Sequence, residues 1–183
     1  MEKPGTPLRD AIISSTIQLL GNRGLTGCSI ENVSRAAECA KGLVNYHFGS
    51  KRRLLDSVAL QLRDRRSQSR SASLSAGLGT RALDALWDTL LREVREGEAR
   101  AWFALAFDDP RLLSLEAQTG LELVRLATRA LDLSDDAIPS LLLLATLDGL
   151  QLSLLSGTPP HEVRESFDRF WLLLLLAESE QHK

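Results

Sequence analysis

Residues 38–55 read ECAKGLVNYHFGSKRRLL, and they predict a short helix, a turn and the start of a second helix. The short helix is expected from Ala40 to His47, and Ser50 is well placed to cap the helix that follows. That second helix opens with three cations, Lys51, Arg52 and Arg53, although a helix N-terminus carries partial positive charge. A bound phosphate would remove this conflict, because a helix N-terminus beside cations binds anions. An exposed basic turn without a ligand remains the alternative from this stretch alone.

The residues just before this stretch complete a helix–turn–helix unit. Residues 29–37 read SIENVSRAA, a pattern that predicts a helix capped by Ser29 with its apolar residues on one face. A tight turn around Glu38 joins it to the next helix, which is typical of the unit whose second helix enters the DNA major groove. The run SIENVSRAA, the run KGLVNYHFGSK at 41–51 and the following Leu-Leu pair resemble the amino-terminal domain of the TetR family of bacterial transcriptional repressors. The resemblance extends roughly from Arg9 to Leu62.

Three residues depart from the family pattern. Glu38 stands where the turn usually has Gly, so a left-handed backbone there would carry a Cβ cost. Ala40 stands where the recognition helix usually opens with Ser or Thr, and Asn45 stands where Tyr is frequent. The expected fold is unchanged by these differences, but the operator sequence is left open.

The resemblance implies an all-α fold of about nine helices in two domains. A three-helix, helix–turn–helix DNA-binding domain is expected in residues 1–50, with a connecting helix at about 50–70. A helical-bundle domain for ligand binding and dimerisation is expected in residues 75–183. The implied function is a repressor that binds a palindromic operator on double-stranded DNA as a homodimer. It would be released by a small-molecule effector and would need no cofactor; a DNA-binding dimer without an inducer is the alternative.

The DNA contacts are expected in and beside the recognition helix. Lys41, Leu43 and Asn45 are the predicted base-reading or groove-edge positions, because Asn can bond adenine and Leu can contact a thymine methyl. Gly42 would let the helix approach the DNA backbone closely. The family motif adds phosphate or sugar contacts at Tyr46, His47 and Lys51, with Thr26 and Ser29 as weaker additions.

The distribution of charge agrees with a DNA-binding amino-terminal region. The whole chain of 183 residues has a net charge of −2, which would not by itself indicate a nucleic-acid partner. Residues 1–70 hold twelve Lys and Arg against six Asp and Glu, a net charge of +6. Residues 71–183 hold ten against eighteen, a net charge of −8. A basic amino-terminal third is the electrostatic pattern expected of a DNA-binding end.

The rest of the chain predicts helices separated by Gly, Pro and cap residues. Helices are expected from Thr6-Pro7 to about 21–24, from Thr80 to the break at Gly97, from Glu98 to Phe107, and from Asp109-Pro110 to Leu131. The Ser/Arg-rich stretch at 65–73 suggests low complexity, so we expect the frayed end of a helix or a mobile loop there. No stretch alternates with a period of two, so no strand is expected.

The last two helices are too apolar around their circumference for surface helices of a monomer. One is expected to start at 134–136 and include Leu141–Leu155, and the other follows the Gly157-Thr158-Pro159 turn. They are either central core helices or a self-complementary four-helix face between two subunits, and the resemblance favours the second. The predicted interface residues are Leu152, Leu155, Phe167, Phe170, Trp171 and Leu174.

The resemblance also implies an effector held among the carboxy-terminal helices. The predicted lining residues are Trp87, Trp102, Phe103 and Phe107, and such an apolar pocket would suit a hydrophobic or aromatic ligand. Aromatic residues at helical spacing more often form a core, and that alternative stays open.

Nothing in the sequence supports an enzyme. None of the three histidines, at 47, 161 and 182, has a nucleophile or a metal partner at motif spacing, and no Gly-rich phosphate loop occurs. Cys28 and Cys39 lack CxxC spacing, so no metal site is expected, and reduced thiols fit a cytoplasmic protein. The longest apolar run, 171–177, is far shorter than the roughly 20 residues of a bilayer span, so no membrane association is expected.

Overall fold

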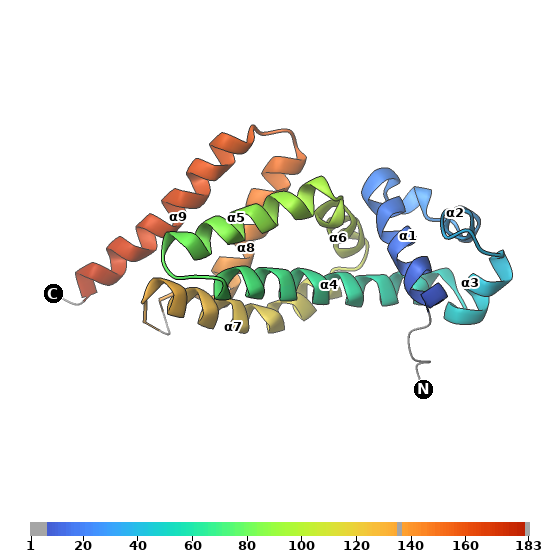
Figure 1. Cartoon of the computed structure of the whole chain (residues 1–183), viewed down its shortest axis with the longest axis horizontal. Helices are drawn as coiled ribbons and strands as arrows, with labels where there is room; N and C mark the ends of the chain where they lie inside the picture. The colour runs from blue at the N-terminus through green and yellow to red at the C-terminus, as the bar shows by residue number, and fades with distance from the viewer. Residues whose placement is uncertain (1–6, 135–136, 182–183) are drawn as a thin grey trace. The chain divides into compact units, whose positions relative to one another are not determined.

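The computed structural model describes residues 7–134 and 137–181, and within these ranges it is all-α with no strand (Figure 1). The nine α-helices of these ranges agree with the predicted number. They are α1 (Pro7–Arg23), α2 (Ile30–Ala36), α3 (Lys41–Phe48), α4 (Lys51–Ser75), α5 (Thr80–Arg95), α6 (Glu98–Asp108), α7 (Arg111–Leu131), α8 (Ser140–Leu155) and α9 (Pro160–Gln181). A single 3-10 turn, η1 (Leu25–Gly27), lies between α1 and α2.

The helices separate into two compact units that do not follow the order of the chain. The first unit contains the residues up to Asp64 together with Arg95–Leu112, and the second contains Arg65–Val94 together with Leu113–Lys183. Helix α6 therefore belongs to the same compact unit as α1, α2 and α3. The sequence predicted a simpler division, with everything after residue 75 in a second domain.

In the first unit, α1 packs against both α2 and α6. Its apolar face supplies Ile12, Ile13 and Leu20, all of which are buried. Gly21 of α1 and Gly97, which precedes α6, bring the two backbones into close contact. A Cβ added to Gly21 would lie 2.8 Å from the carbonyl oxygen of Gly97. Only a residue without a side chain fits at this contact, so α6 is held against α1 through bare backbone.

The prediction of a frayed end or a mobile loop at 65–73 is wrong. Helix α4 continues without a break to Ser75. Two of the arginines in this stretch, Arg66 and Arg70, are buried, together with Ser73 and Leu74. Composition indicated a solvent-exposed segment, but positions 62, 66, 70 and 73 recur at helical spacing on the buried face of α4.

In the second unit, one apolar core joins residues of α5, α7, α8 and α9. Its larger side chains include Leu86, Trp87, Leu147, Phe167 and Trp171. Trp87 lies against Phe167 with 5.5 Å between ring centroids, and Phe167 meets Trp171 edge to face at 6.0 Å. The contact between Trp87 and Phe167 joins α5 to α9, and leucines from α8 pack in the same core.

The predicted start of α8 is also wrong, because the helix begins at Ser140 and not at 134–136. Pro139 precedes its first turn, where the fixed φ of proline suits helix entry. Residues 135–136 of the predicted start lie outside the described residues. The predicted stop after α8 is confirmed, since Gly157 has a φ of 97° in the left-handed region. No helix among the described residues is both long enough and apolar enough to cross a membrane.

Candidate nucleic-acid interface

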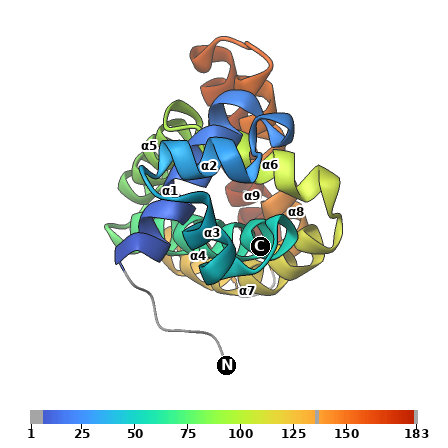
Figure 2. The same ribbon diagram turned by 90° about the vertical axis from the view of Figure 1, so that its right-hand side faces the viewer.

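Helices α2 and α3 form the predicted helix–turn–helix unit, and Figure 2 shows them beside α1. Ser29 caps α2 as expected, since its Oγ accepts the backbone N–H of Asn32 at 3.1 Å. The turn that follows is closed by a hydrogen bond from the Cys39 N–H to the Ser34 carbonyl at 2.9 Å. Glu38 has a φ of 50°, so the left-handed turn position is present although its residue is not glycine.

Helix α3 has one buried face and one exposed face. Val44 and Phe48 are buried, and the guanidinium of Arg9 lies over the Phe48 ring at 5.3 Å. The exposed face carries predicted DNA contacts, namely Lys41, Gly42, Leu43, Asn45 and Tyr46. Tyr46 is the most prominent aromatic residue of this face, with 66% of its surface exposed. The packing of Val44 and Phe48 therefore fixes which side of α3 is available to a partner.

The remaining predicted contacts are distributed around α3. Thr26 and Ser29 are exposed, but their hydroxyls already serve the local backbone: Thr26 Oγ1 donates to the Arg23 carbonyl at 3.3 Å, and Ser29 is the cap of α2. His47 is half-buried between Tyr46 and Phe48. At the start of α3, Ala40 provides no side-chain hydrogen bond to the first turn. The cap is missing because Ala40 stands where the recognition helix usually opens with Ser or Thr.

The junction between α3 and α4 brings the three cations to the start of α4, as predicted. Gly49 makes the bend with a φ of 75°, and Ser50 Oγ accepts the Arg53 N–H at 3.2 Å. Lys51 and Arg53 are exposed and form no ion pair with any described residue. The side chains of these two cations and the partial positive charge of the helix N-terminus together can attract a phosphate group.

Arg52 differs from its two neighbours because it is bound by carboxylates. Its Nε donates to Asp56 at 3.1 Å and its Nη2 donates to Asp109 at 2.6 Å. Asp109 also accepts two side-chain hydrogen bonds from Arg111, at 2.8 and 2.7 Å. The hydrogen bonds from Arg111 outweigh the cost of desolvation and lower the pKa of Asp109 to about 2. The lowered pKa favours the ionised form of the Asp109 carboxyl.

The predicted effector residues are divided between the two compact units. Trp102, Phe103 and Phe107 lie on α6 in the first unit, whereas Trp87 lies in the core of the second. Trp102 and Phe103 are buried, while Phe107 is 65% exposed and stacks on Phe103 at 5.9 Å. Two cavities of about 550 and 580 Å³ occur in the second unit, beside α9 and along α7. Neither is lined by any of the four aromatic residues.

The predicted interface residues need a correction of the same kind. Phe167 and Trp171 lie in the core of their own subunit, and Phe170 and Leu174 pack partly against that core. Leu155 is half-buried, and Leu152 remains exposed. The apolar surface that the described part of α9 leaves in solvent consists mainly of Leu172, Leu173, Leu175 and Leu176. The spacing indicated that these aromatic residues share one face of α9, and that face packs against the core of the same subunit.

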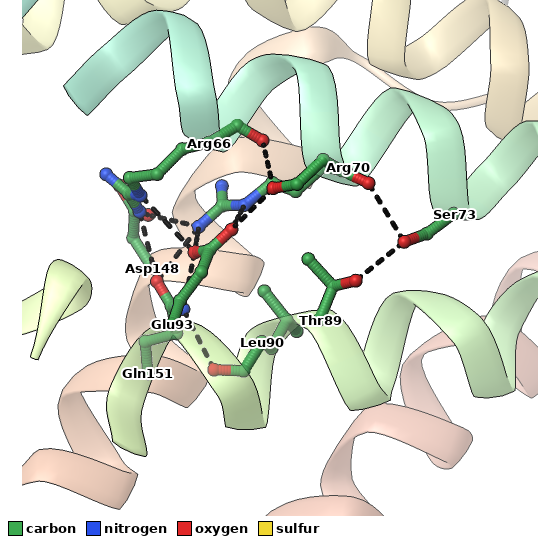
Figure 3. Close-up of polar contacts among 9 residues, drawn as sticks. Arg66, Arg70, Ser73, Thr89, Leu90, Glu93, Asp148 and Gln151 are labelled. Atoms are coloured by element: carbon green, nitrogen blue, oxygen red, sulfur yellow. Dashed lines mark hydrogen bonds and ion pairs between the residues drawn. The ribbon is translucent and has the colours of Figure 1, made fainter. Parts of the chain in front are cut away.

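A buried cluster of charged residues in the second unit was missed by the sequence analysis (Figure 3). Glu93 of α5 accepts hydrogen bonds from Arg66 and Arg70 of α4 and from Gln151 of α8. Asp148 of α8 pairs with Arg66 at 3.0 Å. Burial opposes ionisation of Glu93, but Arg70 and Arg66 outweigh it and lower the pKa of the carboxyl. The four-residue spacing of the two arginines on one helix face was the available signal.

Comparison with known proteins agrees with the helix–turn–helix geometry. A family model described as bacterial regulatory proteins, tetR family, matches residues 12–58. The HTH-type transcriptional regulator AlkX of Mycobacterium tuberculosis is 30% identical over 108 residues, which are 59% of this chain and 46% of AlkX. This chain thus matches about half the length of that relative.

Two solved structures extend the similarity over most of the chain. A transcriptional regulator from Rhodococcus sp. Rha1 has a TM-score of 0.74 and 25% identity, covering 92% of this chain and 96% of its own. The multidrug binding protein EbrR, solved with imidazole, has a TM-score of 0.63 and 24% identity, covering 92% and 90%. The matched residues 12–58 contain α2, the turn at Glu38 and α3, so this chain is similar to bacterial regulatory proteins of the tetR family in the region of its helix–turn–helix unit.

Proposed function

We propose that this chain is a cytoplasmic transcriptional repressor that binds a palindromic operator as a homodimer. The observation that carries the proposal is the exposed face of α3 beside the cationic first turn of α4. Asn45, Leu43 and Lys41 would read base edges in the major groove, because all three are exposed on α3 while Val44 and Phe48 are buried. Lys51 would hold a phosphate at the N-terminus of α4.

A homodimer is supported by the exposed leucines of the last two helices. Leu172, Leu173 and Leu176 of α9 are each more than half exposed, as is Leu141 of α8. An apolar surface of this kind is typical of a protein–protein contact. A two-fold dimer would present two α3 helices to two half-sites, which is how helix–turn–helix proteins read palindromes. Light scattering on the purified chain tests this directly, and a monomeric mass would contradict it.

A small, hydrophobic effector that releases the repressor from DNA is the remaining part of the proposal. It rests on the family resemblance, and EbrR is a solved example that holds a small ligand. The alternative is a regulator without an inducer, in which the buried Trp87, Trp102 and Phe103 serve only as core residues. A thermal-shift screen against a metabolite library separates the two: a saturable rise in melting temperature that also weakens DNA binding supports the effector.

The DNA-binding proposal is tested by selecting bound duplexes from a random pool. We expect an inverted repeat whose half-sites lie about one helical turn, or a multiple of it, apart. Selection of no consensus, together with salt-independent binding, would contradict both operator recognition and the phosphate contacts.

A further inference from the structure

Asp109 lies at an unexpected place for a carboxylate in a DNA-binding unit. It follows α6, yet its Oδ2 is 2.6 Å from Nη2 of Arg52, which neighbours the predicted phosphate contact Lys51. The side chain of Asp109 is only 16% exposed, whereas that of Arg52 is 53% exposed. The carboxylate is thus largely enclosed and lies within hydrogen-bonding distance of a cation in the first turn of α4.

The cluster around Asp109 neutralises charge that the helix N-terminus would otherwise offer to DNA. Arg52 and Arg111 are balanced by Asp56 and Asp109, so the four charged groups sum to zero. Of the three consecutive cations that open α4, Arg52 alone is bound in ion pairs with described residues. The other two, Lys51 and Arg53, keep their charges available to solvent.

We propose that Asp109 limits the affinity of this protein for DNA by holding Arg52 away from the phosphate backbone. The inference rests on the proposed function, because it needs α3 and the start of α4 to face DNA. Phosphate oxygens and the Asp109 carboxylate are alternative acceptors for the same guanidinium, and a guanidinium binds either one well. Asp109 is therefore a positioning residue that acts through Arg52, and it need not touch DNA itself.

The expected gain on removing Asp109 follows from counterion release. Each phosphate contact adds about 0.9 to the slope of log affinity against log salt. With one additional contact, by Arg52, the ratio of variant affinity to wild-type affinity would be about eight-fold larger at about 0.1 M salt than at about 1 M salt. The increase should be similar for every duplex sequence, because phosphate contacts carry no base information.

The test uses Asp109→Asn in the full chain. Asn caps a helix as well as Asp does, so the start of α7 keeps its acceptor; Asp109→Ser, which also retains a cap, is the second variant in case the first is unstable. The matched control is Asp64→Asn, which releases Arg63 from an exposed ion pair on the same helix. Asp64 lies about 18 Å along the axis from Arg52, well beyond the Debye length of about 8–10 Å.

Affinity for a mixed-sequence duplex and for the selected operator is measured between about 50 and 200 mM salt. We expect Asp109→Asn and Asp109→Ser to bind both duplexes several-fold more tightly with a slope steeper by about 0.9. Asp64→Asn should behave as wild type, and adding Arg52→Gln to Asp109→Asn should abolish the gain. Wild-type slopes in both Asp109 variants, or weaker binding by them, would overturn this inference while leaving the proposed function intact. If wild type binds neither duplex, the proposed function fails first, and the inference falls with it.

Discussion

Replacing Glu93 by Gln should strongly destabilise the second compact unit. The carboxylate has no exposed surface, and its Oε2 accepts from Arg66 Nε at 3.3 Å, Arg70 Nη2 at 3.0 Å and Gln151 Nε2 at 2.8 Å. Gln keeps the shape of the side chain but removes its charge. Arg66 and Arg70, each 1% exposed, would then lose the buried carboxylate that both of them contact, although Asp148 remains beside them.

The magnitude follows from the cost of leaving a buried charge without its counterion. Removing one partner of a buried ion pair costs about 3–5 kcal/mol, much more than the net contribution of the intact pair. For a chain of this length, each kcal/mol lowers the melting temperature by about 2–4 °C. We therefore expect Glu93→Gln to melt about 6–20 °C below wild type.

The assay is thermal unfolding followed by circular dichroism, with Asp84→Asn as the matched control. Asp84 also joins two helices, through a 2.6 Å ion pair to Arg164, but the two side chains are 56% and 31% exposed. Exposed pairs of this kind contribute about 0–1 kcal/mol, so the control should melt within a few degrees of wild type. Equal melting temperatures for the two variants would refute the reasoning, because burial would then have no effect on the cost.

The pH dependence gives an independent check. The pKa of Glu93 is lower in the folded chain than in the unfolded chain, so its stabilisation is fully present above the ordinary Glu value. This stabilisation is lost as the pH falls through the lowered folded-state pKa, because the unfolded chain takes up the proton at a higher pH than the folded chain does. Wild type should accordingly approach the stability of Glu93→Gln on acidification, and a constant difference down to acid unfolding would contradict the assignment.

Four further predictions concern DNA binding, packing and assembly. Lys51→Ala should weaken binding to all duplexes equally and reduce the salt slope by about one unit, as measured by titration at several salt concentrations. Asn45→Ala should cost about 1–3 kcal/mol and relax the preference at one base pair per half-site, so an unchanged consensus in a repeat selection would remove it from base reading. Gly21→Ala should destabilise the first unit by about 1–3 kcal/mol in thermal unfolding, because its Cβ would lie 2.8 Å from the Gly97 carbonyl oxygen. Leu173→Glu should give a folded monomer in light scattering, whereas Leu78→Glu, an exposed leucine outside the last two helices, should stay dimeric.

Local sequence was enough to predict the helix–turn–helix unit. Ser29 and Ser50 cap helices because their hydroxyls reach backbone N–H groups a few residues ahead. Gly49 and Gly157 end helices because their backbones enter the left-handed region. These interactions involve residues within one turn of each other, so their pattern is visible in the sequence alone.

The tertiary structure alone decided which side chains are buried and which charges are paired. The Ser/Arg-rich stretch at 65–73 is a helix with one buried face because Glu93 and Gln151, which are distant in sequence, accept hydrogen bonds from Arg66 and Arg70. Phe167 and Trp171 lie in the core because α5 and α8 cover that face of α9, and leucines are exposed on the other. Arg52 is neutralised by a carboxylate 57 residues away. Helical spacing shows which residues share one face of a helix. What covers that face depends on the packing of distant elements, and burial and ion pairing depend on what lies opposite.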